Sequence, residues 1–487
     1  MLDITLFSTF LAINLILGLF HSRQMVTMRD YSVGRKDFST ATLVSTILAT
    51  GIGGGLLFRH LEHTYQEGLY YIIPTVVGGT ANIFLLSLLT LRMGEFIDTL
   101  SIAEAMGKLY GRTVRVITGV SGVLREGTVI GIQFAAMGKA FNLVFEPKAM
   151  TLNILGRTVE LGEVEFCIIV VAPIVVLYAA FGGIRAVAFT DVLQFLTFLV
   201  FIPMLTLIVW RNLKDPDKVV HVLTTNPNFS LKHVLQWNWE TLSMLGLTLY
   251  FTLPTFRPTP FQRIVMARDV YQARDAFAYA ANFRLLTILL LTLIGILLLA
   301  DNPKLNPRDL VDYFINHYSY PGIKGLIAVG IVAMAMSTAD SILNTVTVLV
   351  INDIIKPLQK DFKESLVFTK LLACLVGFVG MCMALTTRDF LKLLLLSGTF
   401  FVPIITAPAL LAILGFRSSI RAVLIGMLAG SIATAIWYAR FKNMFIPSAI
   451  PGMAVNLLFF MGSHYLLREQ GGWVSIKVPA PLVDEEN

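Results

Sequence analysis

The 487-residue chain has little charge, since Asp, Glu, Lys and Arg together make up only 14% of it. Soluble domains carry about 25%, so too few charged side chains are present to cover a surface in water. This scarcity argues against a soluble enzyme, a disordered scaffold and a nucleic-acid-binding protein, despite a net charge of +7. Apolar residues make up 56%, and apolar runs of about 20 residues, long enough to cross a bilayer, recur throughout. The sequence therefore predicts an all-α polytopic membrane protein.

Cysteine is also rare. Cys167, Cys374 and Cys382 lie inside apolar runs, as small hydrophobic residues do, and do not suggest a disulfide framework. The sequence has no Walker phosphate-binding loop, no nucleophile elbow and no cluster of metal ligands. We therefore expect neither an enzyme nor an ATP-driven pump. The His-Leu-Glu-His run at residues 60–63 lacks zinc-protease spacing and is expected to be a solvated outer loop.

Thirteen apolar segments are predicted to cross the membrane. They are residues 4–20, 40–58, 69–91, 116–142, 164–182, 186–210, 240–258, 278–300, 322–350, 366–385, 390–415, 422–439 and 448–467. An odd number places the two termini on opposite sides, and the loops that follow odd-numbered segments carry more Lys and Arg than the others. We therefore predict a multi-pass protein of the plasma (inner) membrane, with the N-terminus outside and the C-terminus in the cytoplasm.

Two of these segments contain residues that interrupt a helix. Residues 51–55 include four glycines, each costing a helix about 1 kcal/mol relative to alanine. Residues 254–260 include three prolines, each of which removes a backbone donor. Broken backbone at membrane depth must line a buried or watery cavity, although close helix packing is an alternative for the glycines. One break lies in the first segment of the group 2–6 and the other in the first segment of the group 7–11. This arrangement is typical of transporters with two inverted five-helix repeats.

Carboxylates and hydroxyls lie inside two apolar segments, where polar groups are costly unless they are paired or functional. Ser337, Asp340 and Ser341 share one helix face because they are spaced i, i+3 and i+4. Thr338 lies beside them, and Asp191 lies in the sixth segment. Such oxygen ligands suit a small hard cation, and carbonyls freed by the glycine break can complete the shell. The alternative is that the hydroxyls bond to carbonyls of their own or a neighbouring helix.

Arg125 and Glu126 lie near the middle of the fourth segment. Adjacent helix positions point about 100° apart, so these two side chains need not pair with each other. A buried guanidinium that faces a cavity is suited to clamping a carboxylate. An ion pair that holds this segment to a neighbouring helix is the alternative interpretation, and the sequence leaves both open.

Three motifs resemble those of the sodium/solute symporter family, which carries proline, sugars, pantothenate, choline and sialic acid. Residues 182–194 match the pattern Gly-Gly-x-x-Ala-Val-x-x-Thr-Asp-x-x-Gln. Residues 335–353 resemble the family's eighth core helix, and Gln262-Arg263 resembles a Gln-Arg pair found after the same break. The number and order of segments are similar from about residue 5 to residue 467.

The resemblance implies a leucine-transporter-type core with a five-plus-five inverted repeat. It divides the chain into residues 1–39, a peripheral helix and cytoplasmic loop; 40–210, the first repeat; 211–239, an outer loop; 240–415, the second repeat; and 416–487, two peripheral helices and a short tail. It also implies a symporter that uses sodium to import a small organic solute by alternating access. The implied partners are therefore Na⁺, the solute and the lipid bilayer, and no nucleic acid.

The resemblance also implies two cation sites. The general sodium site comprises the carbonyls of Ala49, Ile52 and Met334 and the hydroxyls of Ser337 and Thr338. A second cation site comprises Asp191, Ser337, Asp340 and Ser341. Asp340 stands where relatives with this second site carry a hydroxyl, so the extra carboxylate either strengthens cation binding or makes coupling partly proton-dependent. We expect Na⁺ as the coupling ion and no cofactor.

The residues expected to contact the solute are Gly53, Gly54, Gly55, Arg125, Gln133, Tyr250 and Pro254. Tyr250 and Pro254 fit a pattern of proline carriers, but Gly246 replaces its tryptophan, which argues against proline. Arg125 falls close to the arginine with which sialic acid carriers hold the substrate carboxylate. We therefore predict a carboxylate-bearing solute, such as an amino acid or another organic acid. The alternatives are a proton-coupled carrier of the same fold and a solute sensor that acts through a partner protein.

Overall fold

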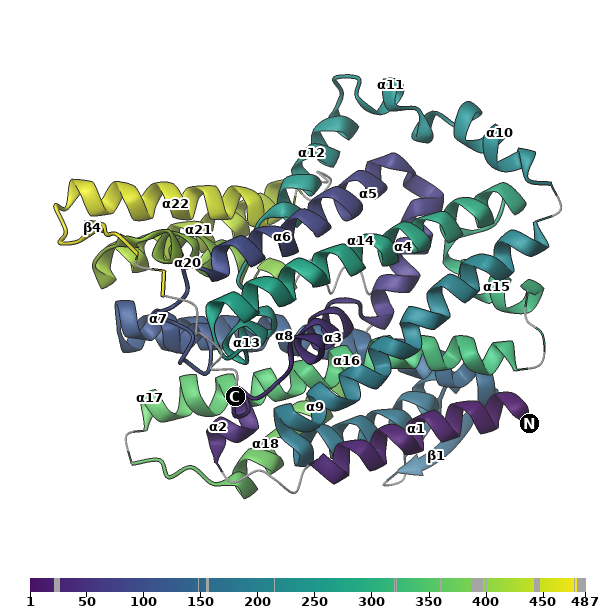
Figure 1. Ribbon diagram of the computed structural model, residues 1–487, viewed down its shortest axis with the longest axis horizontal. Helices are drawn as coiled ribbons and strands as arrows, with labels where there is room; N and C mark the ends of the chain where they lie inside the picture. Colours follow the sequence, from purple (N-terminus) through teal and green to yellow (C-terminus); the bar gives the residue numbers. More distant parts are fainter. Residues whose placement is uncertain are drawn as a thin grey trace, which may run out of the picture.

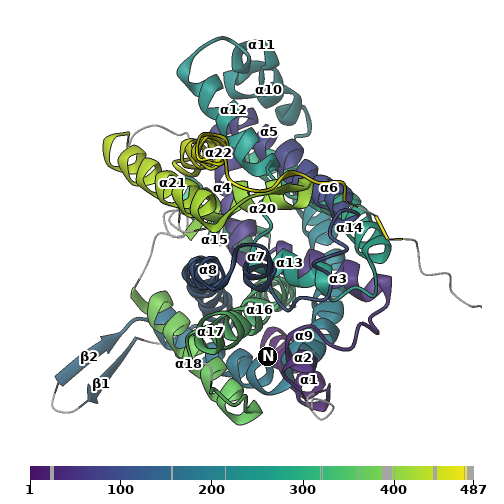
Figure 2. The ribbon, with the colours of Figure 1, turned by 90° about the vertical axis from the view of Figure 1, so that its left-hand side faces the viewer.

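The computed structural model describes most of the chain, and the statements below concern these parts of it. They are residues 1–21, 27–147, 149–154, 157–213, 215–318, 320, 322–359, 361–386, 397–399, 401–441, 447–476 and 478–479. The protein is a helical bundle whose long helices mostly run along the longest axis of the molecule (Figure 1). Several of them are therefore seen nearly end-on in Figure 2.

The first part of the chain, up to Asn212, forms the following elements. They are α1 (Leu2–His21), α2 (Met28–Ser32), α3 (Thr40–Gly51), α4 (Gly54–Glu67), α5 (Leu69–Ile73), the π-helix η2 (Pro74–Gly78), α6 (Gly79–Thr90), α7 (Ile102–Tyr110), α8 (Arg112–Phe145), β1 (Met150–Ile154), β2 (Arg157–Leu161) and α9 (Glu163–Asn212). Strands β1 and β2 form an antiparallel hairpin that the sequence analysis did not predict, and it projects from the bundle in Figure 2.

The remainder of the chain begins with short helices outside the bundle and then returns to long ones. The elements are α10 (Asp217–Thr225), η3 (Pro227–Phe229), α11 (Leu231–Val234), α12 (Trp239–Thr252), α13 (Pro258–Val265), α14 (Val270–Asp301), η4 (Pro307–Asp309), α15 (Leu310–Tyr318), α16 (Ile323–Val348), the π-helix η5 (Leu349–Ile355), α17 (Lys356–Leu358), α18 (Leu366–Thr386), α20 (Val402–Leu414), β3 (Phe416–Arg417), α21 (Ile420–Arg440), α22 (Ala449–Leu466) and β4 (Gly472–Trp473). Helices α10 and α11 arch over one edge of the bundle (Figure 1).

Both predicted breaks are present. Helix α3 begins after Ser39, whose hydroxyl caps the backbone of Thr42 at 3.1 Å. It ends at Gly51, and α4 starts at Gly54 with a bend of 57° between the two helices. Helix α12 ends at Thr252, and α13 starts after five intervening residues, with a proline in its first turn where no backbone donor is needed.

The predicted count of thirteen spans is not confirmed. Among the described residues, nine helices are long and apolar enough to cross a membrane, or ten if the bent pair α3 and α4 counts as one span. Helix α9 covers two predicted segments in 50 residues, and the backbone of Gly183 leaves helical geometry within it (φ 57°, ψ −166°). Helices α12 and α20 have only 14 and 13 residues. Residues 390–396 and 400 of the eleventh predicted segment lie outside the described residues.

Helix α16 lies at the centre of the bundle. It packs against α8, α9, α3 and α1, and nearly all of its side chains are buried. Helices α20, α21 and α22 pack on one another at one side of the molecule, in yellow-green in Figure 1. The central position of α16 places its polar residues, which would be costly against lipid, entirely inside protein.

The expectation of a solvated loop at residues 60–63 is wrong. These residues lie in α4, which continues to Glu67, and His60 is fully buried. A ring nitrogen of His60 lies 2.8 Å from the hydroxyl of Thr292 on α14. Because the run is helical, His60 lies on the face of α4 that packs against α14. Composition alone did not reveal this.

Candidate functional site

The end of α3 meets the polar face of α16. The hydroxyl of Ser337 donates to the carbonyl of Ala49 at 2.8 Å and lies 3.0 Å from the carbonyl of Met334. The hydroxyl of Thr338 lies 3.2 Å from the carbonyls of both Thr50 and Met334. The last carbonyls of a helix have no partner within it, so α16 supplies the partners that the break of α3 requires. Four of the five predicted sodium-site residues, Ile52 excepted, contact one another here.

The glycines at the break allow close approach. A Cβ at Gly53 would lie 2.8 Å from Oε1 of Gln133 and 2.9 Å from the hydroxyl of Thr338. A Cβ at Gly54 would lie 2.9 Å from the side chain of Ala335. Gly51 differs, because a Cβ there would meet nothing within 4 Å and the residue is exposed. At the break, Gly53 and Gly54 therefore pack tightly against α8 and α16, whereas Gly51 is accessible to solvent-sized groups.

A second polar cluster lies one turn further along α16. Asp191 of α9 is fully buried and accepts a hydrogen bond from the hydroxyl of Thr46 on α3. The guanidinium of Arg263 on α13 lies 3.6 Å from the same carboxylate. This guanidinium also donates to the hydroxyls of Ser341 and, at 3.0 Å, of Thr50. Arg263 thus brings a side-chain cation into the region of the predicted second cation site.

Asp340 completes this cluster. Its side chain is fully buried, and one carboxylate oxygen accepts a hydrogen bond of 2.6 Å from the hydroxyl of Tyr178 on α9. The other oxygen has no hydrogen-bond partner among the described residues. With Asp191, Asp340 gives the cluster two carboxyl groups for the one guanidinium of Arg263. Asp191, Asp340 and Ser341 of the predicted second cation site are therefore close together, with one acidic group in excess.

Arg125 and Glu126 pair with each other on α8, at 2.8 Å between Nη1 and Oε2. Both are at least nine-tenths buried, and Nε of Arg125 and Oε1 of Glu126 have no partner among the described residues. Among the described residues, Arg125 therefore forms its ion pair within α8 and not, as the alternative interpretation expected, with a neighbouring helix. Gln133, on the same helix, lies against the glycine break, and its Oε1 is also without a partner in the described part of the chain.

Tyr250 and Pro254 lie at the other break. Tyr250 is in the last turns of α12, and Pro254 belongs to the non-helical stretch that follows. The carbonyl of Leu253 in this stretch accepts a hydrogen bond from Asn82 of α6, which satisfies one group freed by the break. Arg257 ends the stretch and precedes α13.

Sequence reasoning missed several of the polar residues around the breaks. They are Thr46, Thr50, Tyr178, Arg257 and Arg284. Thr46 and Thr50 carried a usable signal, since they are spaced i, i+4 on the helix that ends at the break. Arg284 interrupts a long apolar run, and an intramembrane charge of this kind indicates a functional site.

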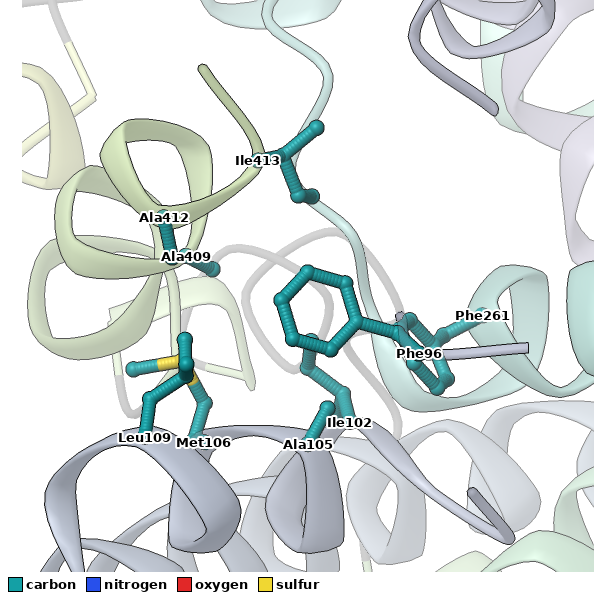
Figure 3. Close-up of a pocket in the computed structure, with 9 residues that line it drawn as sticks. All are labelled: Phe96, Ile102, Ala105, Met106, Leu109, Phe261, Ala409, Ala412 and Ile413. Atoms are coloured by element: carbon teal, nitrogen blue, oxygen red, sulfur yellow. The ribbon is translucent and has the colours of Figure 1, made fainter. Parts of the chain in front are cut away.

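A separate pocket lies between α7, α13 and α20 (Figure 3). Its lining is entirely apolar, with Phe96 and Phe261 on one side and alanines and Ile413 of α20 on another. No polar group of these residues is available to orient a charged solute. The candidate site is therefore at the helix breaks and not in this pocket.

Two interrupted helices that meet beside a central polar helix are the architecture of a leucine-transporter-type membrane transporter. No family model matches the sequence. The chain is 22% identical over 416 residues to a protein of Drosophila melanogaster named as a sodium-dependent multivitamin transporter, covering 78% of this chain and 65% of that protein. The chain thus spans slightly less than two thirds of that relative. It is 23% identical over 471 residues to the high-affinity proline transporter PutP of Bacillus subtilis, covering 91% and 94%.

Solved structures show the same fold. A Na⁺-coupled sialic acid symporter, in its substrate-bound outward-open state, superposes with a TM-score of 0.82 at 18% identity, over 97% of this chain and 99% of that one. Mhp1, a nucleobase-cation-symport-1 family transporter in a closed conformation, superposes with a TM-score of 0.56 at 13% identity, over 91% and 96%. These comparisons confirm the predicted fold class and the resemblance to the sodium/solute symporter family. The chain is a multi-pass membrane protein.

Proposed function

We propose that the chain is a Na⁺-coupled symporter that imports a small carboxylate-bearing solute by alternating access. The names of its relatives and of its structural neighbour support sodium coupling, and the fold supports alternating access. The proposal includes the orientation expected from the sequence, with the N-terminus outside and the C-terminus in the cytoplasm, and the division into repeats at residues 40–210 and 240–415. No enzymatic step is part of it.

One observation carries the proposal. The hydroxyls of Ser337 and Thr338 lie against the carbonyls of Ala49 and Thr50 at the broken end of α3. The C-terminal end of a helix carries partial negative charge, and hydroxyl and carbonyl oxygens are the ligands that a hard cation prefers. The hydroxyls can turn their lone pairs toward Na⁺ when it binds. The ion would then replace hydrogen bonds between α3 and α16 with shared coordination.

This arrangement gives sodium a structural effect. Helix α3 belongs to the first predicted repeat and α16 to the second, so an ion held by both favours the arrangement in which they are in contact. A solute that binds beside the glycine break would then bind to a site whose conformation sodium has already ordered. By linkage, the solute must tighten sodium binding by the same factor by which sodium tightens solute binding.

The test is solute uptake into proteoliposomes under an inward sodium gradient, with potassium as the replacement cation. A panel of amino acids, sialic acid, pantothenate, choline, sugars, monocarboxylates and dicarboxylates identifies a transported solute. Ser337→Ala removes a hydroxyl from the proposed site and is expected to raise the sodium concentration for half-maximal uptake by about tenfold, equivalent to about 1.4 kcal/mol.

Ser431→Ala is the matched control. The Ser431 hydroxyl bonds to the Met427 carbonyl of its own helix, α21, at 2.8 Å and lies far along the chain from the breaks. The control is expected to retain wild-type sodium dependence. Unchanged sodium dependence in Ser337→Ala and in Thr338→Ala would show that the ion does not bind at the end of α3.

The cluster around Asp340 favours a second candidate, a proton-coupled carrier of the same fold. Asp340 and Asp191 together exceed the positive charge of Arg263 by one, and all three side chains are buried. A proton or a second sodium ion would compensate the remaining carboxylate. Uptake that persists without sodium, follows a pH gradient and disappears in Asp340→Asn would favour the proton.

A further inference from the structure

The breaks also gather positive charge, in a second group of residues that does not include Asp191. Arg257 separates two buried residues, Phe256 and Pro258, yet its own side chain is partly exposed. Its electrostatic neighbours are Arg125 and Glu126 on α8, Tyr250 on α12 and Arg284 on α14. Groups on three helices therefore converge on this arginine. A partly exposed arginine between buried neighbours, whose electrostatic neighbours lie on three other helices, is held within the bundle and not at its lipid-facing surface.

Arg284 of α14, one of these electrostatic neighbours, also lies close to the glycine break. Its guanidinium lies against Gly79 of α6, where a Cβ would collide with it. Arg284 also lines a small pocket together with Ile52 and Leu56, which flank the glycine break. Nε of Arg284 is buried and has no partner among the described residues. Arg284 therefore lies against Gly79 of α6 and beside the residues that flank the glycine break.

The charges in this cluster do not balance. Arg125, Arg257 and Arg284 supply three guanidinium groups, and Glu126 supplies one carboxylate, which is already bound to Arg125 at 2.8 Å. Neither Arg257 nor Arg284 forms an ion pair or a side-chain hydrogen bond with any described residue. Positive charge that is withdrawn from water is costly unless an anion accompanies it. A guanidinium also offers two parallel donors that match one carboxylate.

We propose that Arg257 and Arg284 form an anion subsite and that the solute is a small dianion, a dicarboxylate in which each arginine receives one acidic group. This inference rests on the proposed function, because it assigns the substrate class of the same site. In this proposal Arg125 does not bind the solute carboxylate directly, because it is paired with Glu126, and it lies beside the subsite. The solute then supplies the negative charge that the cluster lacks.

Thermal unfolding and calorimetric titration of the purified full-length protein in sodium chloride test the subsite. The probes are malonate, succinate, glutarate and adipate, each compared with its monomethyl ester, which removes one charge and retains the carbon chain. At least one diacid is expected to bind at least about tenfold more tightly than its ester. Arg257→Gln and Arg284→Gln are each expected to abolish this preference.

Two further variants keep the test informative. Arg257→Lys retains the charge and is expected to recover part of the preference, which separates a charge effect from misfolding. Arg211→Gln, at the exposed end of α9, is expected to bind diacids as the wild type does. A wild-type protein that binds no diacid more tightly than its ester, or a preference that survives both glutamine variants, would overturn the inference.

The sodium-driven uptake assay separates this inference from the function on which it rests. Sodium-driven uptake of a neutral or zwitterionic solute, with no diacid preference, would overturn the anion subsite and leave the symporter. Arginine-dependent diacid binding without sodium-driven uptake of any solute would overturn the symporter and leave the subsite. Sodium-driven uptake of a diacid that Arg257→Gln abolishes supports both.

Discussion

The two sides of the helix breaks carry opposite charge. Beside the end of α3, Asp191 and Asp340 exceed the single guanidinium of Arg263. Beside the end of α12, three arginines exceed the single carboxylate of Glu126. The first side has hydroxyl and carbonyl oxygens that suit a cation, whereas the second has guanidinium N–H donors that suit an anion, including Nε of Arg125 and of Arg284, which have no partner among the described residues. Under the two proposals above, this central region binds two ligands of opposite sign, which would attract each other when both are bound.

The largest expected effect comes from removing Arg263, the positively charged side chain beside Asp191 and Asp340. Arg263→Gln leaves Asp191 and Asp340 buried without a positive partner, and breaking a buried pair in this way costs about 3–5 kcal/mol. We expect the unfolding free energy of the purified protein in detergent to fall by that amount. Denaturant titration followed by tryptophan fluorescence measures it.

The corresponding substitution among the three arginines is not expected to lower the unfolding free energy. Arg257→Gln removes a charge that lies near two other arginines and one glutamate, so stability without solute is expected to stay unchanged or to rise. Equal destabilisation by Arg257→Gln and Arg263→Gln would remove the distinction between the two sides. Arg263→Gln combined with Asp191→Asn is expected to recover part of the loss.

A smaller effect is expected from the glycines that join the two sides. Gly53→Ala places a Cβ 2.8 Å from Gln133 and 2.9 Å from Thr338, so neighbouring groups must move. Overpacking of this kind costs about 1–3 kcal/mol, and we expect a comparable fall in stability together with a slower maximal rate of uptake. Gly51→Ala is the matched control, because its Cβ would meet nothing within 4 Å. Similar behaviour of the two variants would contradict the close packing.

The smallest effect is expected outside the membrane. Lys36 donates a 2.7 Å hydrogen bond to the exposed Asp98, which lowers the pKa of that carboxyl below its ordinary value. The stability that this pair contributes is present above the unfolded pKa of about 4 and is lost as the pH falls through the lower, folded pKa. Because the pair is exposed, Lys36→Met is expected to cost less than about 1 kcal/mol at neutral pH. A cost as large as that of Arg263→Gln would show that burial is not what distinguishes these ion pairs.

The helix breaks could be predicted from the sequence because Gly and Pro affect the backbone locally. Four glycines within residues 51–55 and three prolines within residues 254–260 are dense enough to disfavour a continuous helix, and both interruptions are present. The polar face of α16 was predictable for a similar reason, because Ser337, Asp340 and Ser341 follow helical spacing.

The partners of these residues could not be predicted in the same way, because they depend on contacts between distant segments. Thr46 reaches Asp191 across 145 positions of the chain, and Tyr178 reaches Asp340 across 162. The separation into two charged sides also depends on such contacts, since Arg257 and Arg284 approach each other only when α14 packs beside the breaks. The count of thirteen spans is not confirmed, because α9 runs through two predicted segments with only the backbone of Gly183 leaving helical geometry, and because α12 and α20 are short.

Thr50 has a position that relates both proposed cation sites to each other. Its carbonyl lies 3.2 Å from the hydroxyl of Thr338, while its own hydroxyl contacts Ser341 at 2.9 Å and Arg263 at 3.0 Å. A single residue therefore serves the sodium site with its backbone and the acidic cluster with its side chain. If an ion at the proposed sodium site draws this carbonyl toward itself, we expect the hydroxyl to shift with it, so that occupancy of one proposed site would be sensed at the other through a displacement within one amino acid.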